Sequence, residues 1–176
     1  MVGGLLEGRL VTLVVVHSPN LGQDAFLLRL LDLVAEFAVG DLLLMGDFNL
    51  VWDPSLDRSG PVTPHSRAFN RPVRVTLRGL GLRDVWRERF PHWSAFTFFS
   101  HVHWSFFRID HIFVSNALVP LLTDAGMADI VTSDHAPLWV PLDLRGGLPR
   151  TGRWLMHPWL LWDPALRAEL RSQIEH

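Results

Sequence analysis

The stretch "LLLMGDFNLVWD", Leu42 to Asp53, decides the fold of this chain. An apolar run leads into an acid and an amide, Asp47 and Asn49, that stand two positions apart. A short apolar run bounded by polar residues is typical of a buried strand, and the loops that follow such strands commonly present functional groups. We therefore expect Leu42 to Met45 to be a central strand that places both polar side chains on one side.

The residues before this stretch predict a strand and a helix. Leu10 to His17, "LVTLVVVH", is apolar and rich in β-branched residues, and it stops at the turn-forming "SPN". Asp24 to Val39 then repeats apolar residues at helical spacing. Strand, helix and strand in this order indicate an α/β fold, with the acid and amide at the carboxyl end of the second strand.

The residues after the stretch predict a helix and several short strands. A helix over Ser66 to Leu80 conflicts with Pro72, because proline breaks or kinks a helix interior. The expected strands are Ser94 to Phe99, Arg108 to Ser115, Ala128 to Thr132 and Ala136 to Leu144. Beyond them "RGGLPRTGR" is typical of a linker, and a capped terminal helix is expected to start near Asp163.

The composition of the 176 residues limits the classes of function. Hydrophobic residues make up 48% and charged residues 19%, and no apolar run reaches the roughly 18 to 20 residues that span a bilayer. The first residues lack the pattern of a secretory signal, so we expect a soluble, intracellular protein without membrane contacts. The absence of cysteine excludes disulfides and thiolate chemistry. With a net charge of -2, nucleic acid would have to be held by local arginines or through a metal.

Polar clusters end or interrupt three of the predicted strands. They are Asp47 with Asn49, Arg108 with Asp110, and Ser133-Asp134-His135. Taken singly, each has a structural explanation as a turn cap or a surface ion pair. Together they are the parts that metal-assisted phosphodiester cleavage requires: a carboxylate for water, oxygen ligands for Mg²⁺ and donors for the phosphate. The sequence has neither a Gly-x-Ser-x-Gly elbow nor a Gly-x-x-x-x-Gly-Lys loop, so serine hydrolase chemistry fits less well and we expect no small-molecule cofactor.

Three motifs in a fixed order resemble a known family. "GDFN" from Gly46, "RIDHIFVS" from Arg108 and "SDHAPL" from Ser133 are similar to the exonuclease-endonuclease-phosphatase superfamily. Within it, "LRDVWRERFPHWSAFTFFSHVHWSFFRIDHIFVSNAL" looks most like the apurinic-type endonuclease domain of LINE-type (non-LTR) retrotransposons. The tail "RWLMHPWLLWDP" resembles the segment that joins this endonuclease to a reverse transcriptase. The resemblance implies a four-layered α/β sandwich, in which two packed β-sheets are flanked by helices and the active site lies at the mouth.

The same resemblance implies roles for individual residues. Asp47 matches the carboxylate that positions or activates the attacking water, and Asn49 matches the amide that holds the scissile phosphate. His135 matches the donor to a non-bridging phosphate oxygen, and Asp110 the acid that orients and charges that imidazole. Asp134 matches the metal-site acid. The residues expected to contact the substrate are Asn20, Thr97, Arg108 and Ser133.

The chain departs from the family pattern in two places. His17 stands where the family normally has a tyrosine that reaches the phosphate, so we expect it to act as a shorter donor at the catalytic site. The family domain also begins earlier, with strands that carry an asparagine and the principal Mg²⁺-binding glutamate. We therefore expect 1–145 to be the C-terminal part of an N-terminally truncated domain, followed by a linker and terminal helix over 146–176. Such a fragment would bind Mg²⁺ or Mn²⁺ weakly or not at all, and would expose a strand edge and apolar surface.

Two functions follow from these expectations. The first is a Mg²⁺-dependent endonuclease of retrotransposon origin that hydrolyses a DNA phosphodiester bond, acts beside a reverse transcriptase domain in its parent element and works in the nucleus. The alternative is a catalytically inactive retroelement remnant with at most weak nucleic-acid binding. Another branch of the superfamily, such as a phosphoinositide phosphatase or a sphingomyelinase, shares the same phosphate-handling core, so the substrate has to be argued from the site.

Overall fold

The structure is a computed structural model that describes residues 1–60, 70–131 and 133–144. The chain divides into two compact units, Met1–Gly146 and Gly147–His176, and all described residues belong to the first. The linker and terminal helix predicted over 146–176 lie outside the described residues. Among the helices that are described, none is long and apolar enough to cross a bilayer.

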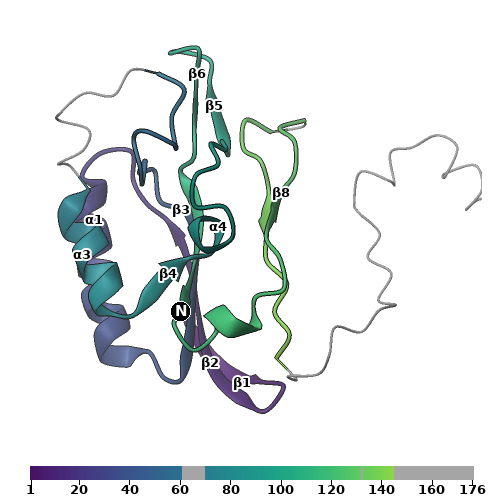
Figure 1. Cartoon of the computed structure of the whole chain (residues 1–176). Coiled ribbons are helices and arrows are strands. Elements are labelled where there is room, and N and C mark those ends of the chain that lie inside the picture. The colour runs from purple at the N-terminus through teal and green to yellow at the C-terminus, as the bar shows by residue number, and fades with distance from the viewer. Residues whose placement is uncertain (61–69, 132, 145–176) are drawn as a thin grey trace, which may run out of the picture. The chain divides into compact units, whose positions relative to one another are not determined.

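A five-stranded sheet forms the centre of the first unit (Figure 1). Its strands, in spatial order, are β1 (Val2–Leu6), β2 (Arg9–His17), β3 (Asp41–Asp47), β7 (Asp110–Ser115) and β4 (Leu82–Asp84). The strands β2 and β3 run parallel, and every other neighbouring pair is antiparallel. The central position predicted for the Leu42 to Met45 strand is therefore confirmed, because β3 is the third strand of five.

The parallel pair is connected by helix α1 (Gln23–Phe37), so the predicted succession of strand, helix and strand is confirmed. The sequence did not predict β1, because all five of its residues are exposed and it therefore lacks the alternation of a half-buried strand. A tight turn joins β1 to β2, and its two residues, Glu7 and Gly8, both have positive φ, at 49° and 79°. Positive φ at both turn positions matches the right-handed twist of a hairpin.

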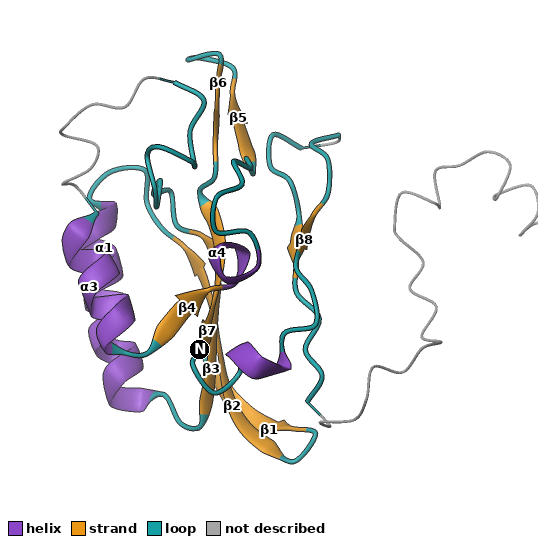
Figure 2. Ribbon diagram, viewed as in Figure 1, coloured by secondary structure: helices purple, strands orange, loops and turns teal. Residues whose placement is uncertain are grey.

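Helices α1 and α3 (Arg71–Gly79) cover one face of the sheet (Figure 2). Pro72 lies in the first turn of α3, where its missing N–H costs no hydrogen bond. The helix predicted from Ser66 therefore begins later in the described chain, and 66–69 lie outside the described residues. The buried side chains of this cluster are Val14, Val16, Leu27, Leu31, Val34, Leu42, Leu44, Phe48, Leu50, Trp52, Val73, Leu77, Leu82 and Phe113.

The opposite face is covered by shorter elements. They are α4 (Val85–Arg89), the single 3-10 turn η1 (Val119–Leu121), β8 (Gly126–Met127) and β9 (Leu138–Trp139). Their segments enclose a second cluster of buried residues, namely Val11, Leu43, Val85, Val114, Leu118 and Ala125. A separate ribbon pairs β5 (Phe98–Ser100) with β6 (Ser105–Phe107). In the described residues, the smaller sheets of this α/β fold are thus the two-stranded pairs β5–β6 and β8–β9.

The late strands are shorter or displaced relative to the sequence-based prediction. The strand expected over Ala128 to Thr132 lies at β8 instead, and the long one expected over Ala136 to Leu144 contains only β9. The strand β1 lies at an edge of the five-stranded sheet, and apolar side chains of β1 and β2 are exposed: Val2, Leu5 and Val15 are 70%, 76% and 69% exposed. The alternation of apolar residues overestimated the length of the strand predicted over Ala136 to Leu144. Alternation does not distinguish a strand in a hydrogen-bonded ladder from an extended segment that packs on a sheet.

Gly46 lies in β3 opposite Val16 of β2, where the two backbones leave no room for a side chain. Its φ is 131°, and a Cβ atom at this position would lie 2.0 Å from the carbonyl oxygen of Val16. Any side chain would therefore force the parallel strands apart one residue before Asp47.

We predict that Gly46→Ala lowers the free energy of unfolding by more than about 3 kcal/mol, because it combines a backbone clash with a strained φ. Urea denaturation measures this loss. Gly79→Ala is the matched control, since a Cβ on this last residue of α3 meets open space. The control should change the free energy of unfolding by less than about 1 kcal/mol; equal effects at both glycines would contradict the prediction.

Candidate active site

Three strand ends bring polar residues together at one edge of the central sheet. In the parallel pair, His17 at the end of β2 is the register partner of Asp47 at the end of β3. In the antiparallel pair, Asp47 is the partner of Asp110, the first residue of β7. Side chains of directly paired residues lie on the same face of a sheet. The fold therefore aligns an imidazole and two carboxylates across neighbouring strands.

Asp47 and Asn49 meet through a hydrogen bond and not through strand alternation. The strand β3 ends at Asp47, and Asn49 has a left-handed φ of 46°. The backbone N–H of Asn49 donates to Oδ1 of Asp47 at 2.8 Å, and the Asn49 amide donates to the carbonyl of Ser18 at 2.7 Å. The strand conformation, on which the expected placement of both side chains on one side depends, does not persist to Asn49, because the chain turns after Asp47. The turn nevertheless brings the two residues together.

Ser18 is a buried part of this turn that the sequence did not single out. Its N–H donates to the carbonyl of Asp47 at 2.9 Å, and its hydroxyl donates to the carbonyl of Phe48. These bonds join the loops that follow β2 and β3. Since the Ser18 carbonyl also receives the Asn49 amide, Ser18 fixes the orientation of Asn49. The "SPN" turn signal located this loop but gave no indication of the contact.

Asp110 and His135 form a hydrogen-bonded pair. Nδ1 of His135 lies 2.8 Å from Oδ2 of Asp110, and both side chains are partly buried, at 32% and 18% exposure. A carboxylate accepts hydrogen bonds, so Nδ1 carries the hydrogen and Nε2 is left for another partner. The structure thus brings together the acid and the imidazole that the sequence motifs named separately.

Four further predicted residues surround these pairs. His17 is 82% exposed at its side chain, and its Nε2 lies 3.7 Å from Oδ2 of Asp47. Asn20 is exposed in the loop after β2, and its carbonyl accepts from the Gln23 amide. Ser133 and Asp134 are exposed beside His135, where the Ser133 hydroxyl accepts from the His135 N–H at 3.1 Å. These side chains are all accessible from solvent.

Two residues predicted to bind substrate do not face solvent. Thr97 and Arg108 are both 0% exposed. The Thr97 hydroxyl accepts two backbone hydrogen bonds, and the Arg108 guanidinium is enclosed by carboxylates. The expectation of substrate contact is therefore corrected for both residues: their polar groups are already bonded inside the protein and have no access to a ligand.

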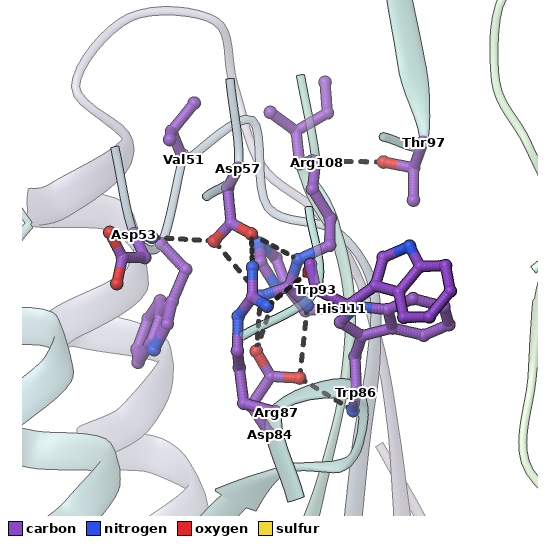
Figure 3. Close-up of polar contacts among 12 residues, drawn as sticks. Val51, Asp53, Asp57, Asp84, Trp86, Arg87, Trp93, Thr97, Arg108 and His111 are labelled. Atoms are coloured by element: carbon purple, nitrogen blue, oxygen red, sulfur yellow. Dashed lines mark hydrogen bonds and ion pairs between the residues drawn. The ribbon is translucent and has the colours of Figure 1, made fainter. Parts of the chain in front are cut away.

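Arg108 lies at the centre of a buried ionic network that Figure 3 shows. Its guanidinium donates to both oxygens of Asp57, at 2.8 and 3.1 Å, and to both oxygens of Asp84, at 3.2 and 2.7 Å. Arg87 forms a second ion pair with Asp57. His111 lies 3.6 Å from Asp84 through Nδ1, and its Nε2 lies 3.1 Å from the Leu50 carbonyl. The network links the loop after Asn49 with β4, α4 and β7.

Few sequence signals point to this network. Asp57 lies in a segment rich in Pro, Ser, Asp and Gly, where acids are ordinary turn residues. Asp84 stands in "LRDVW", directly after Arg83, so the sequence suggests a local ion pair and not a buried partner far away in the chain. Its carboxylate also caps α4 by accepting from the Trp86 N–H at 3.0 Å.

Sequence and structure comparisons place this geometry in a family. The model of the endonuclease/exonuclease/phosphatase family matches residues 3–135, which contain the whole of the described site. The chain belongs to the endonuclease/exonuclease/phosphatase family. The matched residues include Asp47, Asp110 and His135.

One curated relative of this endonuclease/exonuclease/phosphatase chain comes from a mobile element. It is the Transposon TX1 uncharacterized 149 kDa protein of Xenopus laevis, which is 29% identical over 174 residues. The alignment covers 94% of this chain and 13% of the relative. The chain thus corresponds to a small part of that protein's length. The predicted likeness to LINE-type elements is confirmed at this level.

Solved structures of DNA-acting enzymes share the fold. An AP endonuclease from Archaeoglobus fulgidus superposes with a TM-score of 0.60 at 19% identity, over 77% of this chain and 64% of that one. A 3′ phosphatase from Neisseria, solved bound to product DNA hairpin, has a TM-score of 0.53 at 25% identity, over 69% and 51% of the two chains. The α/β fold class is confirmed by these neighbours, and this chain spans about half to two thirds of their lengths.

The described residues do not form a protein cage for a metal ion. No group of three or more His, Asp or Glu side chains in this part of the chain is arranged to hold one. Asp134, the predicted metal-site acid, has an exposed side chain whose Oδ1 lies 3.4 Å from the Ser133 hydroxyl. One exposed carboxylate leaves Mg²⁺ mostly hydrated.

The pKa values of Asp47 in the site and Asp84 in the network shift in opposite directions. Burial raises the pKa of Asp47 above its ordinary value, and the negative charge of Asp110 adds to this effect. Burial acts in the same direction on Asp84, but the charge of Arg108 and the contact with His111 outweigh it and hold its pKa well below the usual range. Asp47 therefore accepts a proton more readily than an ordinary aspartate, as a general base should.

We predict that Arg108→Met lowers the free energy of unfolding by about 3 to 5 kcal/mol, because it leaves Asp57 and Asp84 buried without their main partner. Arg83→Met is the matched control, since it breaks an ion pair with Glu88 in which Arg83 is half exposed. The control should cost about 0 to 1 kcal/mol. Urea denaturation compares the variants, and a loss at Arg108 no larger than at Arg83 would refute the structural role of the network.

A second prediction concerns Asp47→Asn. Because the folded-state pKa of Asp47 is raised, its ionisation costs stability as the pH rises through that value. The amide removes this cost and keeps an oxygen for the Asn49 N–H. The variant should gain stability over the wild type at about pH 7 and show no gain at about pH 3, below the unfolded pKa. Urea denaturation at both pH values measures the difference in the free energy of unfolding between the variant and the wild type. The same difference at both pH values would show that ionisation of Asp47 is not the cause.

Proposed function

We propose that this chain is the phosphodiesterase domain of a retroelement protein, and that it hydrolyses a phosphodiester bond in DNA with the help of Mg²⁺ or Mn²⁺. The observation that carries the proposal is the alignment of Asp47, Asp110 and His135 across β3, β7 and the segment after β8. Membership of the endonuclease/exonuclease/phosphatase family and the relative from a Xenopus transposon support it.

The side chains divide the reaction among them. Asp47, whose pKa is raised by burial and by the nearby charge of Asp110, takes the proton of the attacking water. Asn49 is fixed by Ser18 and offers the remaining N–H of its amide to the phosphate. Because Nδ1 of His135 is bonded to Asp110, its Nε2 is the ring atom left to contact a phosphate oxygen. His17 supplies a second, more exposed donor beside Asp47.

The proposed partner is DNA, and in the parent element the domain would act beside a reverse transcriptase. The relative is a transposon protein, and the Neisseria neighbour was solved with a DNA hairpin. A nick that leaves a 3′ hydroxyl would provide such a reverse transcriptase with a primer. A nuclear location follows from this proposal.

We predict that the chain nicks supercoiled plasmid only when a divalent cation is added, with a requirement in roughly the millimolar range because one carboxylate holds the ion weakly. Asp47→Ala should reduce the rate by roughly 100-fold or more, because the general base is lost. Asp129→Ala is the matched control, since this aspartate is exposed and lies outside the site. Gel electrophoresis follows the conversion to open circles.

The absence of nicking by folded protein at any Mg²⁺ or Mn²⁺ concentration would favour the second candidate function. This is a catalytically inactive retroelement remnant with at most weak nucleic-acid binding. The observation that favours it is that the described residues lack a three-ligand metal group. Binding to a DNA duplex, measured as a function of salt, then shows whether any affinity remains beyond non-specific phosphate contacts.

A further inference from the structure

Thr97 is a fully buried residue that touches the backbone on both sides of the Asp110–His135 pair. Its hydroxyl oxygen lies 3.1 Å from the backbone nitrogen of Ile109 and 3.1 Å from that of Asp110, and it accepts both hydrogen bonds. Its own N–H donates to the carbonyl of Phe107 at 2.8 Å. One side chain thus fixes the residues immediately before β7 and the first residue of that strand.

The two hydrogen bonds to the hydroxyl are unusual for a strand. Successive N–H groups of an extended chain point to opposite edges, so a sheet ladder cannot bind both from one side. Here the N–H groups of Ile109 and Asp110 converge on one oxygen, and β7 begins at this point. The Thr97 hydroxyl therefore sets the local backbone direction from which the Asp110 side chain projects.

Thr97 also holds the segment that carries His135. Its carbonyl accepts the N–H of Ala136 at 2.7 Å, directly after the histidine. The next residue, Phe98, forms a bridge with His135, and their rings lie 4.9 Å apart between centroids. The acid and the imidazole come from segments 25 residues apart, and Thr97 bonds to the backbone of both.

The hydrogen bonds around Thr97 also reach β3, the strand that carries Asp47, the proposed general base. The carbonyl of Ile109, whose N–H is bound by Thr97, accepts the N–H of Phe48 at 2.9 Å. Phe48 directly follows Asp47 and is itself buried. A shift of the backbone at Ile109 would therefore be transmitted to the Asp47 end of β3 as well as to Asp110.

We propose that Thr97 is a positioning residue, whose hydroxyl holds Asp110 and His135 at hydrogen-bonding distance without contacting the substrate. Its effect on rate rests on the proposed phosphodiesterase function, whereas its effect on the geometry of the pair does not. Loss of the hydroxyl leaves two buried N–H groups without their acceptor, and the backbone at the start of β7 moves to satisfy them.

Nuclear magnetic resonance of the ¹⁵N-labelled full chain tests the proposal without relying on activity. In the wild type, the ¹⁵N chemical shifts of the two His135 ring nitrogens should show that the hydrogen is held on Nδ1 by Asp110, and this pattern is the His135 signature. Thr97→Val keeps the shape of the side chain but loses the acceptor, so this signature should be lost or averaged. Thr97→Ser retains the oxygen and should restore it. If Thr97→Val does not fold, Thr97→Ser still decides, because loss of the signature in a folded serine variant overturns the proposal.

Thr12→Val is the matched control for a buried threonine. The Thr12 hydroxyl accepts from the Val39 N–H at 2.9 Å and donates to the Val39 carbonyl at 2.7 Å, away from the site. This variant should lose stability and leave the His135 signature unchanged. A folded Thr97→Val chain with a wild-type signature, or an equal loss of the signature in Thr12→Val, would overturn the positioning role.

If the chain nicks plasmid, Thr97→Val should lower kcat by roughly 10- to 100-fold with little change in KM, because misplacement of catalytic groups costs rate more than binding. Thr97→Ser should recover most of the rate. Loss of the His135 signature in a chain that never nicks DNA supports the positioning role and rejects only the proposed function. An unchanged kcat in Thr97→Val would overturn the positioning role.

Discussion

The pairing of Arg108 with Asp57 and Asp84 is the interaction on which the rest of the structure depends. Transfer of each charge from water into the interior costs several kcal/mol, and the cost is recovered only when the geometry of the pairing is good. Here all three groups are buried and the guanidinium is bidentate to both carboxylates. The three segments that carry these charges can therefore meet in one arrangement only, because any displacement would leave a buried charge unpaired.

That arrangement determines where the candidate site forms. Arg108 precedes β7, so its position fixes the register in which Asp110 lies opposite Asp47. Asp57 lies in the loop that follows Asn49, and its carbonyl accepts the Arg108 N–H at 2.8 Å. The ionic network thus fixes the backbone next to the site, while Arg108, Asp57 and Asp84 themselves are buried. Aspartates serve both the site and the network, and their pKa values shift in opposite directions. Burial, with a contribution from the charge of Asp110, raises the pKa of Asp47, whereas the charge of Arg108 outweighs burial and lowers that of Asp84.

Much of the fold was predictable from local patterns. The succession of β2, α1 and β3 follows from apolar periodicity, and the family follows from three short motifs in order. The errors have physical causes. The strand β1 has no buried face to produce alternation, and β8 and β9 are short because only two residues of each pair in a ladder. The turn at Asn49 was not predictable from local patterns: β3 ends at Asp47, and Asn49 has a left-handed backbone conformation.

The sequence by itself determined the family, the central strand and the identities of the acids, amide and imidazoles at the site, because these depend on residue types and their order. The tertiary structure decided which polar residues face a ligand and which support them. Thr97 and Arg108 belong to motifs beside the site, yet both are buried, and the partners of Arg108 lie 51 and 24 residues away in the chain. Burial and long-range pairing are properties of the packed chain, so local sequence patterns cannot supply them.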